Sequence, residues 1–288
     1  MTLFARRSST QLLTFFALVG FGCTPAAEDV DTPVDCVADA AGLAGVAKTQ
    51  ASLTFDKPFG PDAPVQMATV VGDRATGAHG TIGIFGPGFN SGPHTHTGAY
   101  HGVVLQGRIS NPFGTETDAP ELGPGSYWLV PAGEQHATVC VSSDEDCIFY
   151  FHADDAFDFT PIDELTDAPS SEAKAIDAAS FEFEEVAPFV SMAGAWGDRN
   201  SGSHGTFGRF PGNATSPVHV HSSEYTGVVI SGTVINPFAD GVETALSTGG
   251  SWQVPVNSEH RTACTSGEDC LFYFHSSAAF DFMPVCEE

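Results

Sequence analysis

Two short histidine motifs, 125 residues apart, carry the side chains of this chain that are best suited to chemistry. His94 and His96 are separated by one residue, and His219 and His221 repeat the same spacing. In a β-strand, residues two positions apart point to the same side, so each pair would present two imidazoles to one face. Neutral imidazole is a common metal ligand. The pattern therefore predicts two metal sites, each of which needs a further ligand.

The third imidazole of each site is expected from a motif further along the chain. His136 follows Pro131 by five residues, and His260 follows Pro255 by the same distance. Three neutral imidazoles leave coordination positions open for water, a substrate or dioxygen. The expected cofactor is a divalent transition metal, namely Fe, Zn, Mn, Cu or Ni. The expected ligands are His94, His96, His136, His219, His221 and His260.

These motifs belong to an internal repeat that covers most of the chain. Residues 77–81 recur as residues 202–206, and residues 149–152 recur as residues 272–275. Self-similarity of this kind indicates a duplicated structural unit. Both copies consist of short β-branched or aromatic runs separated by Gly, Pro, Asn and Asp. That pattern predicts an all-β fold, with one sandwich or barrel in each copy.

The spacing of the motifs resembles that of the cupins, and two copies in register resemble a bicupin over residues 50–285. The resemblance implies two tandem β-barrels of the double-stranded β-helix or jelly-roll type. Each would hold a divalent metal near its mouth with three His and usually one Glu. Two-cupin proteins without an assigned function are the most similar group. The matching residues are Gly88, His94, His96, Tyr100, Gly107, Gly125, Pro131, Gly133 and His136, then His219, His221, Tyr225, Gly232, Gly249, Pro255, Asn257 and His260.

Both copies depart from the cupin pattern at the Glu position, where Tyr100 and Tyr225 stand. His101 and Glu224 are alternative ligands if the strand register shifts by one, which would turn the Tyr outward. We expect the Tyr to point inward, because it recurs in both copies. A phenol is a poorer ligand than a carboxylate, so the predicted catalytic role of the Tyr is to orient a bound molecule or to donate a proton.

Neighbouring residues carry further expectations. Gly102 and Gly227 lie two residues beyond the Tyr and are expected to leave space beside the metal. Asn257 stands where the first copy has Gly133, which slightly favours the first site. The remaining paired His are expected to be hydrogen-bonded strand residues, and the recurring aromatic residues are expected to form core. These are His79, His152, His204 and His275, and Phe149, Tyr150, Phe151, Phe157, Phe159, Phe272, Tyr273, Phe274, Phe280 and Phe282.

The cysteines follow the repeat as well. Cys140 and Cys147 bracket one acidic loop, and Cys264 and Cys270 bracket its counterpart. A disulfide across each hairpin, Cys140–Cys147 and Cys264–Cys270, is therefore expected in an oxidising compartment. The pair Cys36–Cys286 would clip the start of the body to its end. A cysteine metal site is the alternative to these bridges.

The first segment is typical of a secretory signal, with two Arg before an apolar run at residues 12–21. Cys23 resembles the lipidation site of bacterial lipoproteins, whereas an ordinary secretory signal is the alternative. The predicted organisation is a signal peptide (1–22), an acidic tether after lipidated Cys23 (23–45), a first cupin domain (46–165) and a second (171–288). The expected location is the bacterial cell envelope, with the protein exported and held at the membrane only by its lipid anchor.

The charge of the chain restricts its partners. It has 36 Asp and Glu against 10 Lys and Arg, a net charge of −26. Such a surface repels phosphate backbones, so nucleic acid is not an expected partner. The charge of a bound divalent metal favours an anionic small molecule as ligand.

Two functions remain open. The cupin resemblance implies a metal-dependent enzyme acting on a small molecule, either an oxidoreductase of the dioxygenase type, an isomerase or a lyase. The missing Glu argues against oxalate-type decarboxylation, which in cupins accompanies three His and one Glu. The alternative is a non-catalytic surface lipoprotein that binds a small solute or a metal, because the two sites are nearly equal.

Overall fold

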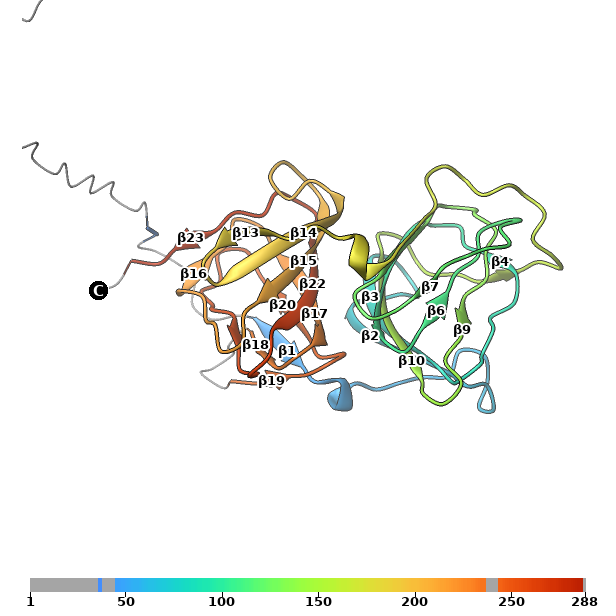
Figure 1. The fold of residues 1–288 in the computed structure, drawn as a ribbon, viewed down its shortest axis with the longest axis horizontal. Coiled ribbons are helices and arrows are strands. Elements are labelled where there is room, and N and C mark those ends of the chain that lie inside the picture. Colours follow the sequence, from blue (N-terminus) through green and yellow to red (C-terminus); the bar gives the residue numbers. More distant parts are fainter. Residues whose placement is uncertain (1–35, 38–44, 237–242, 287–288) are drawn as a thin grey trace, which may run out of the picture. The chain divides into compact units, whose positions relative to one another are not determined.

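The computed structural model describes residues 36–37, 45–236 and 243–286. The predicted signal and lipidation site lie outside this part of the chain, as does most of the predicted tether. The described residues form two strand-rich halves and contain no α-helix (Figure 1). Their only helical turns are two 3-10 turns, η1 (Gln50–Ser52) and η2 (Ala178–Ser180). The predicted all-β fold with two barrels is confirmed.

The first barrel is built on a six-stranded antiparallel sheet, with two small sheets completing it. The large sheet has the order β12 (Lys174–Ile176), β8 (Tyr127–Val130), β5 (Tyr100–Gln106), β10 (Cys147–Ala153), β3 (His79–Phe85) and β2 (Val65–Gly72). The small sheets are β7 (Glu121–Leu122), β6 (Ile109–Ser110) and β9 (Val139–Cys140), and β11 (Thr160–Pro161) with β4 (His94–Thr95).

The second barrel repeats this plan with a seven-stranded sheet. Its order is β1 (Val46–Lys48), β20 (Ser251–Val254), β17 (Tyr225–Ser231), β22 (Cys270–Ser276), β15 (His204–Phe210), β14 (Val190–Gly197) and β13 (Glu184–Ala187). The small sheets are β19 (Ala245–Leu246), β18 (Val234–Ile235) and β21 (Ala263–Cys264), and β16 (His219–Val220) with β23 (Met283–Pro284).

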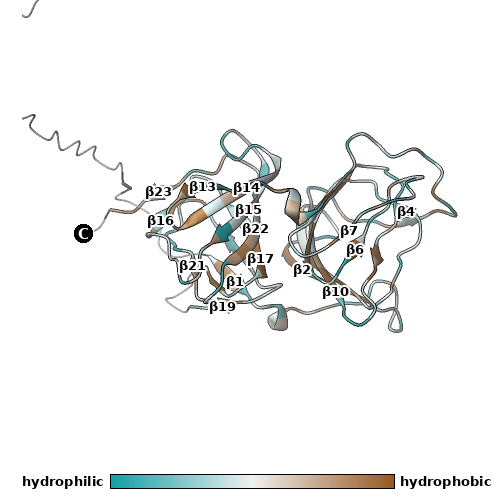
Figure 2. Cartoon of the chain, in the orientation of Figure 1, coloured by the Kyte–Doolittle hydropathy of each residue, from teal (hydrophilic) through white to brown (hydrophobic). Residues whose placement is uncertain are grey.

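Strand β10 is buried on both faces, and the period-two alternation of its side chains divides it between two cores. Phe149 and Phe151 enter the core of the first barrel. Tyr150 points the other way, into a core that also contains Tyr273 of β22. Figure 2 shows hydrophobic, brown strand segments in both halves of the molecule. The two large sheets therefore pack against each other through their outer faces, and the described residues from Cys36 onward form one compact unit.

The two barrels exchange edge strands. Strand β1, which precedes the first barrel in the sequence, pairs with β20 of the second. Strand β12, which follows the first repeat, pairs with β8 of the first barrel. The division of the chain into domains at 46–165 and 171–288 stays a prediction. The large sheet of the second barrel nevertheless includes β1 from the first range, and the large sheet of the first barrel includes β12 from the second range.

The described residues contain three disulfides, and they join the predicted pairs. Cys140–Cys147 links β9 to β10, and Cys264–Cys270 links β21 to β22. Cys36–Cys286 joins the two ends of the described chain. Disulfides persist in oxidising compartments, so the three bonds indicate an extracytoplasmic location. Among the described residues, no helix has the length and apolarity that spanning a membrane requires.

Candidate metal centres

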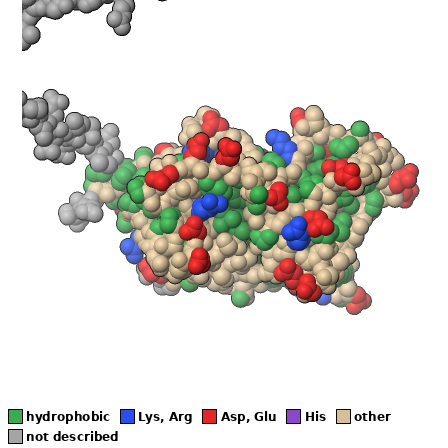
Figure 3. Space-filling model, in the orientation of Figure 1, with side chains coloured by type: hydrophobic (Ala, Val, Ile, Leu, Met, Phe, Trp, Pro, Cys, Tyr) green, Lys and Arg blue, Asp and Glu red, His purple; other side chains and the backbone are tan. Residues whose placement is uncertain are grey.

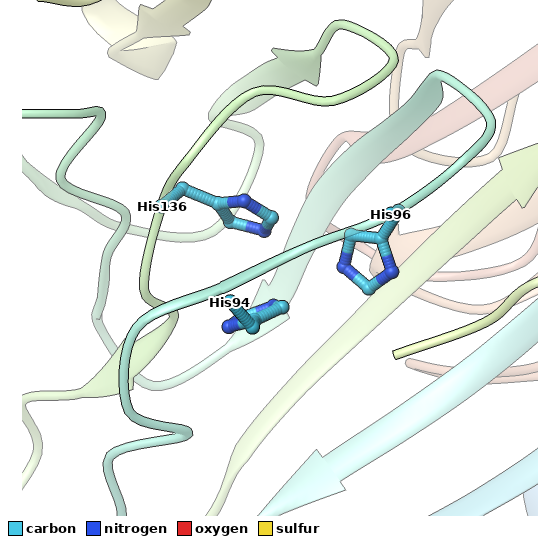
Figure 4. A group of neighbouring side chains, drawn as sticks. All are labelled: His94, His96 and His136. Carbon is cyan, nitrogen blue, oxygen red and sulfur yellow. The ribbon is translucent and has the colours of Figure 1, made fainter. Parts of the chain in front are cut away.

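Main-chain pairing brings the distant third histidine to each motif. The amide of His94 donates to the carbonyl of His136 at 2.9 Å, and the amide of His136 donates back at 3.0 Å. In the second copy, His219 and His260 exchange the same two bonds at 2.9 and 3.0 Å. His94 begins β4, and His136 lies in the loop between β8 and β9. Backbone hydrogen bonds thus hold His136 beside His94 and His260 beside His219. Figure 4 shows the three imidazoles of the first copy close to one another.

Each trio offers three nitrogen ligand atoms that lie within 4.8 Å of one another. All six rings are buried, with at most 4% of any residue exposed. The His94–His136 ring centroids lie 4.1 Å apart, and those of His219–His260 lie 4.2 Å apart. The two copies have therefore kept the same arrangement, as the repeat predicts.

In both trios, every Nδ1 faces a main-chain carbonyl. His94 Nδ1 lies 2.8 Å from Gly92 O, and His136 Nδ1 lies 3.1 Å from Glu134 O. His96 Nδ1 contacts the carbonyl of Asp158. A carbonyl can only accept, so each Nδ1 carries the proton and each neutral ring keeps its lone pair on Nε2. The second copy repeats this with His219 to Pro217 at 2.8 Å, His260 to Ser258 at 2.9 Å, and His221 to Asp281.

These lone pairs fit a metal. The Nε2 atoms of His96 and His221 are buried and have no hydrogen-bond partner in the described structure. An orphaned buried acceptor is costly, and an ion at the centre of the trio would remove that cost. Metal-bound His usually donates its other ring N–H to a carbonyl or carboxylate, which is the arrangement seen at all six rings.

Burial keeps the ligand rings neutral. Loss of hydration lowers the pKa of His94 and of His219 to about 4. The pKa of His221 falls to about 3, and that of His260 falls to about 2, because burial and the neighbouring imidazoles both disfavour a charge. Neutral imidazole is the form that binds metal, so the trios need no deprotonation at neutral pH.

Tyr100 and Tyr225 point into the barrels, as expected, and each hydroxyl lies beside the third histidine. Tyr100 Oη is 3.1 Å from His136 Nε2, and Tyr225 Oη is 3.0 Å from His260 Nε2. Because Nε2 holds a lone pair, the phenol donates this bond. Burial raises the pKa of Tyr100 to about 12 and raises that of Tyr225 as well. Both phenols therefore keep their proton.

The alternative ligands lie elsewhere. His101 projects to the opposite face of β5, where its Nδ1 is 2.6 Å from Tyr127 Oη. Glu224 is exposed to solvent. Neither belongs to a candidate metal group among the described residues. Since successive strand residues point to opposite faces, placing the Tyr inward places its neighbours outward.

A Phe-Asp-Phe segment covers each trio, and its aromatic rings were expected in the core. The Phe157 ring stacks on His96 at 4.4 Å, and Phe159 stacks on His94 at 4.3 Å. In the second copy, Phe280 stacks on His221 at 4.0 Å and Phe282 on His219 at 4.3 Å. Phe157 and Phe280 are partly buried and pack against the barrel cores, as expected. Phe159 and Phe282 belong to no core cluster, and Phe282 is 41% exposed, so the prediction was wrong for these two rings. They form the outer wall of the sites.

The cavities beside the trios are small and apolar. The first has about 30 Å³ and the second about 50 Å³. A water molecule needs roughly 10–15 Å³, so each cavity can hold only a few atoms.

The space expected next to Gly102 and Gly227 does not exist, because the rings of Trp128 and Trp252 fill it. A Cβ atom at these glycines would lie 2.1 and 2.2 Å from the rings. A bulky ligand would need the Phe-Asp-Phe segment to move.

The difference between Gly133 and Asn257 does not separate the sites. Gly133 has φ of 75° and Asn257 has φ of 56°, so both adopt the left-handed conformation. Asn tolerates this region better than most residues. The turn before His260 therefore has the same form as the turn before His136, and the reason for favouring the first site disappears.

Comparisons with known proteins agree with this architecture. Residues 53–178 match a domain model described as a domain of unknown function (DUF4437), and residues 207–276 match the model described as the cupin domain. No curated protein matches the sequence.

Solved structures with the same fold are distant in sequence. A putative dioxygenase from Nostoc punctiforme is 14% identical, with a TM-score of 0.61 over 81% of this chain and 82% of its own. An oxalate decarboxylase of Bacillus subtilis is 14% identical (TM-score 0.57; 84% and 78% coverage), and that of Lactobacillus farciminis is 11% identical (TM-score 0.58; 88% and 91% coverage). The chain thus has a two-domain fold like that of these solved structures, a segment that matches the cupin domain model, and two buried three-His clusters.

Proposed function

We propose that this protein is an exported bicupin that binds a metal ion at each three-His centre and uses it in chemistry on a small molecule. The main support is the state of the six rings: each commits its Nδ1 proton to a backbone carbonyl, which leaves the lone pair on Nε2. The Nε2 atoms of His136 and His260 accept from Tyr100 and Tyr225, and these phenols would have to turn away when a metal binds. Packing alone does not require this arrangement twice in one chain.

His94, His96 and His136 would hold one divalent ion, and His219, His221 and His260 would hold the other. When bound, a divalent transition metal supplies an electrophilic centre with open coordination positions. Tyr100 and Tyr225 hold a proton at Oη beside the third ligand and orient a molecule that enters the cavity. The Phe-Asp-Phe segments exclude water from it.

The reaction class that we favour is oxidation by dioxygen. Isomerase and lyase chemistry are the alternatives that we rank after it. Small apolar cavities suit dioxygen and a small substrate. One structural neighbour is described as a putative dioxygenase, whereas others are oxalate decarboxylases. A Tyr at the position where cupins usually carry Glu argues against the oxalate reaction.

A non-catalytic role in binding a metal or a small solute is the second candidate. The observation that favours it is the closure of both sites, whose cavities of about 30 and 50 Å³ leave little room for a substrate. The two trios also show no divergence into an active and an inactive copy.

Elemental analysis tests the shared part of both functions. Purified wild type should contain two equivalents of one transition metal, His94→Ala and His219→Ala should each contain one, and the double variant none. His79→Asn is the matched control, since His79 is a buried strand residue outside the trios, and it should keep two. If both single variants retain two equivalents, the metal centres are not at these trios.

Oxygen uptake by the metal-loaded protein against a panel of small organic anions separates the two roles. Turnover that disappears in the double variant supports the enzyme. Saturable metal or solute binding without turnover of any panel member supports the binding protein.

We also propose that the protein is anchored through lipidated Cys23. Growth with labelled palmitate should label the wild type and leave Cys23→Ser unlabelled. Labelling that is absent from both would show an ordinary secretory signal.

A further inference from the structure

A large cavity lies between the two barrels and uses none of the six trio histidines. It has a volume of about 560 Å³, and both repeats contribute to its lining. This volume falls in the range of small-molecule sites, roughly 300–1,000 Å³. The cavity is therefore ten times or more larger than either cavity at the trios.

A column of four rings forms one part of its wall. Trp196 stacks on His101 with ring centroids 4.3 Å apart. His101 lies 4.9 Å from His152 at an interplanar angle of 12°. His152 in turn lies 3.8 Å from His275 at 2°. The two inner rings, His101 and His152, belong to the first barrel, and the two outer rings, Trp196 and His275, belong to the second. The column therefore exists only when the two barrels are packed together.

Buried tyrosines fix the column. Tyr273 Oη receives the indole N–H of Trp196 at 2.8 Å and lies 3.0 Å from His152 Nε2. A hydroxyl can take part in several hydrogen bonds, so Tyr273 holds Trp196 and His152 at the same time. Tyr150 Oη is 2.9 Å from His275 Nε2. Burial and the neighbouring imidazoles lower the pKa of His275 to about 3, so the column is neutral and presents π-faces rather than charge.

The repeat is broken at this place. His101 corresponds to Thr226 in the other copy, and Trp196 corresponds to Val71. The two residues come from different barrels and stack directly on each other. Two independent departures from the repeat thus meet in a single contact, which simple inheritance of a duplicated core does not explain.

The carboxylates are the only Asp, Glu, Lys or Arg side chains in the described lining of the cavity. Asp154, Asp155 and Glu224 contribute carboxylates, and the described lining contains no Lys or Arg. Ser276 Oγ donates to the carbonyl of Glu224 at 2.8 Å and so holds the segment that bears this carboxylate. Figure 3 shows that acidic side chains outnumber basic ones on the visible face of the molecule. An anion would meet three carboxylates here without any compensating cation.

We propose that this cavity binds a small organic cation of the ammonium type. Aromatic faces attract a cation through their quadrupoles, and the attraction grows when the site is partly desolvated. The ring column supplies these faces, and the three carboxylates supply the opposite charge. The cavity contains none of the six trio histidines, although Tyr225 contributes both to its lining and to that of the cavity at the second trio.

Tryptophan fluorescence of the metal-loaded protein offers a direct measurement. Trp196 is half-buried and lines the cavity, whereas Trp128 and Trp252 are at most 2% exposed. Benzyltrimethylammonium should change the emission saturably, with heat of binding in calorimetry at the same concentration. Benzoate and benzyl alcohol, which resemble it in size without its charge, should bind at least tenfold more weakly. Equal binding of benzoate would overturn the proposal.

Substitution by the residue of the other copy provides matched variants. In Glu224→Ala the new residue is the one at the matching position of the first copy, Ala99. In His101→Thr and Trp196→Val the new residues are likewise those at the matching positions, Thr226 and Val71. Each should weaken benzyltrimethylammonium binding about tenfold, measured by calorimetry because Trp196→Val removes the fluorophore. Glu224 is exposed, so its variant should fold normally and keep its metal content. Wild-type affinity in Glu224→Ala and in His101→Thr would overturn the proposal, even if the metal centres are confirmed.

Discussion

Asp158 makes one contact with His96 and a second with the residue that follows it. Its main-chain carbonyl accepts the Nδ1 proton of His96, and its carboxylate accepts the amide of the next residue, Thr97, at 2.8 Å. Asp281 makes the same two contacts with His221 and Ser222. The segment that covers each candidate metal centre is therefore bonded to a ligand of that centre.

Replacement of this carboxylate should weaken metal binding. Asp158→Ala removes the bond to Thr97 and loosens the carbonyl that orients His96. Loss of such an outer contact typically costs 10–100-fold in metal affinity. Competition with a chromophoric chelator would measure it, with Asp144→Ala in an exposed hairpin loop as control. Unchanged affinity in Asp158→Ala would show that the stacked Phe rings alone hold the segment.

The tyrosines should affect turnover more than metal content. Tyr100→Phe removes the donor beside His136 but no ligand nitrogen, so the protein should still bind two equivalents. If the enzyme proposal holds, removing the positioned proton donor from both sites in the double variant Tyr100→Phe/Tyr225→Phe should lower kcat about 100-fold or more. With the pKa of Tyr100 at about 12, the wild-type rate should show no ionisation of this phenol between pH 6 and 9. A metal content that falls in Tyr100→Phe would instead identify the phenol as a ligand.

The terminal disulfide should contribute more to stability than either hairpin disulfide. Cys36 and Cys286 are 250 residues apart in sequence, whereas Cys140 and Cys147 are separated by 7. In the chain-entropy model, closing the long loop contributes about 5 kcal/mol and closing the short one about 2–3 kcal/mol. Denaturant unfolding of the paired Cys→Ala variants would compare them. A larger loss for the hairpin pair would contradict the prediction.

Acid should destabilise the contact between the barrels. The pKa of His275 is about 3 in the folded protein, below its ordinary value of 6.5, because the ring is buried. The unfolded chain therefore binds a proton that the folded chain does not, once the pH falls below about 6.5. Unfolding free energy should drop by about 1.4 kcal/mol per pH unit for each such imidazole, down to the folded pKa.

Urea titrations of metal-free protein at pH 7.5, 6, 5 and 4.5 would show this drop. His275→Gln should have a shallower dependence between pH 6.5 and 5, a window above the range in which carboxylates titrate. The same slope in variant and wild type would assign the effect to other histidines.

The repeat made the trios predictable. His94, His96 and His136 have partners at matching positions, so the spacing could be checked twice within one sequence. Placing Tyr100 inward then followed from strand alternation. The disulfide pairs were likewise accessible, because two of them bracket short loops in both copies.

The Phe-Asp-Phe segments were harder to interpret. Residues 156–159 and 279–282 both read Ala-Phe-Asp-Phe, and this identity was the signal that something more than core packing was needed. Asp158, however, contacts the site through its main-chain carbonyl as well as through its side chain. Every residue has such a carbonyl, so the amino-acid sequence cannot show which carbonyl faces a histidine.

The column between the barrels could not be predicted at all. His101 and Trp196 do not recur in the repeat, and they meet only because the outer faces of two sheets pack together. Strands β1 and β12 have three residues each, too few for alternation to reveal their partners.

The crossing of β1 and β12 makes the halves of this molecule inseparable. A fragment cut after residue 165 would lack β12 and would expose the unpaired edge of β8, while its β1 would have lost its own partner. Unpaired edges invite association with other chains, so such fragments should be prone to aggregate. Any evolutionary or laboratory rearrangement of the chain must therefore keep both copies together.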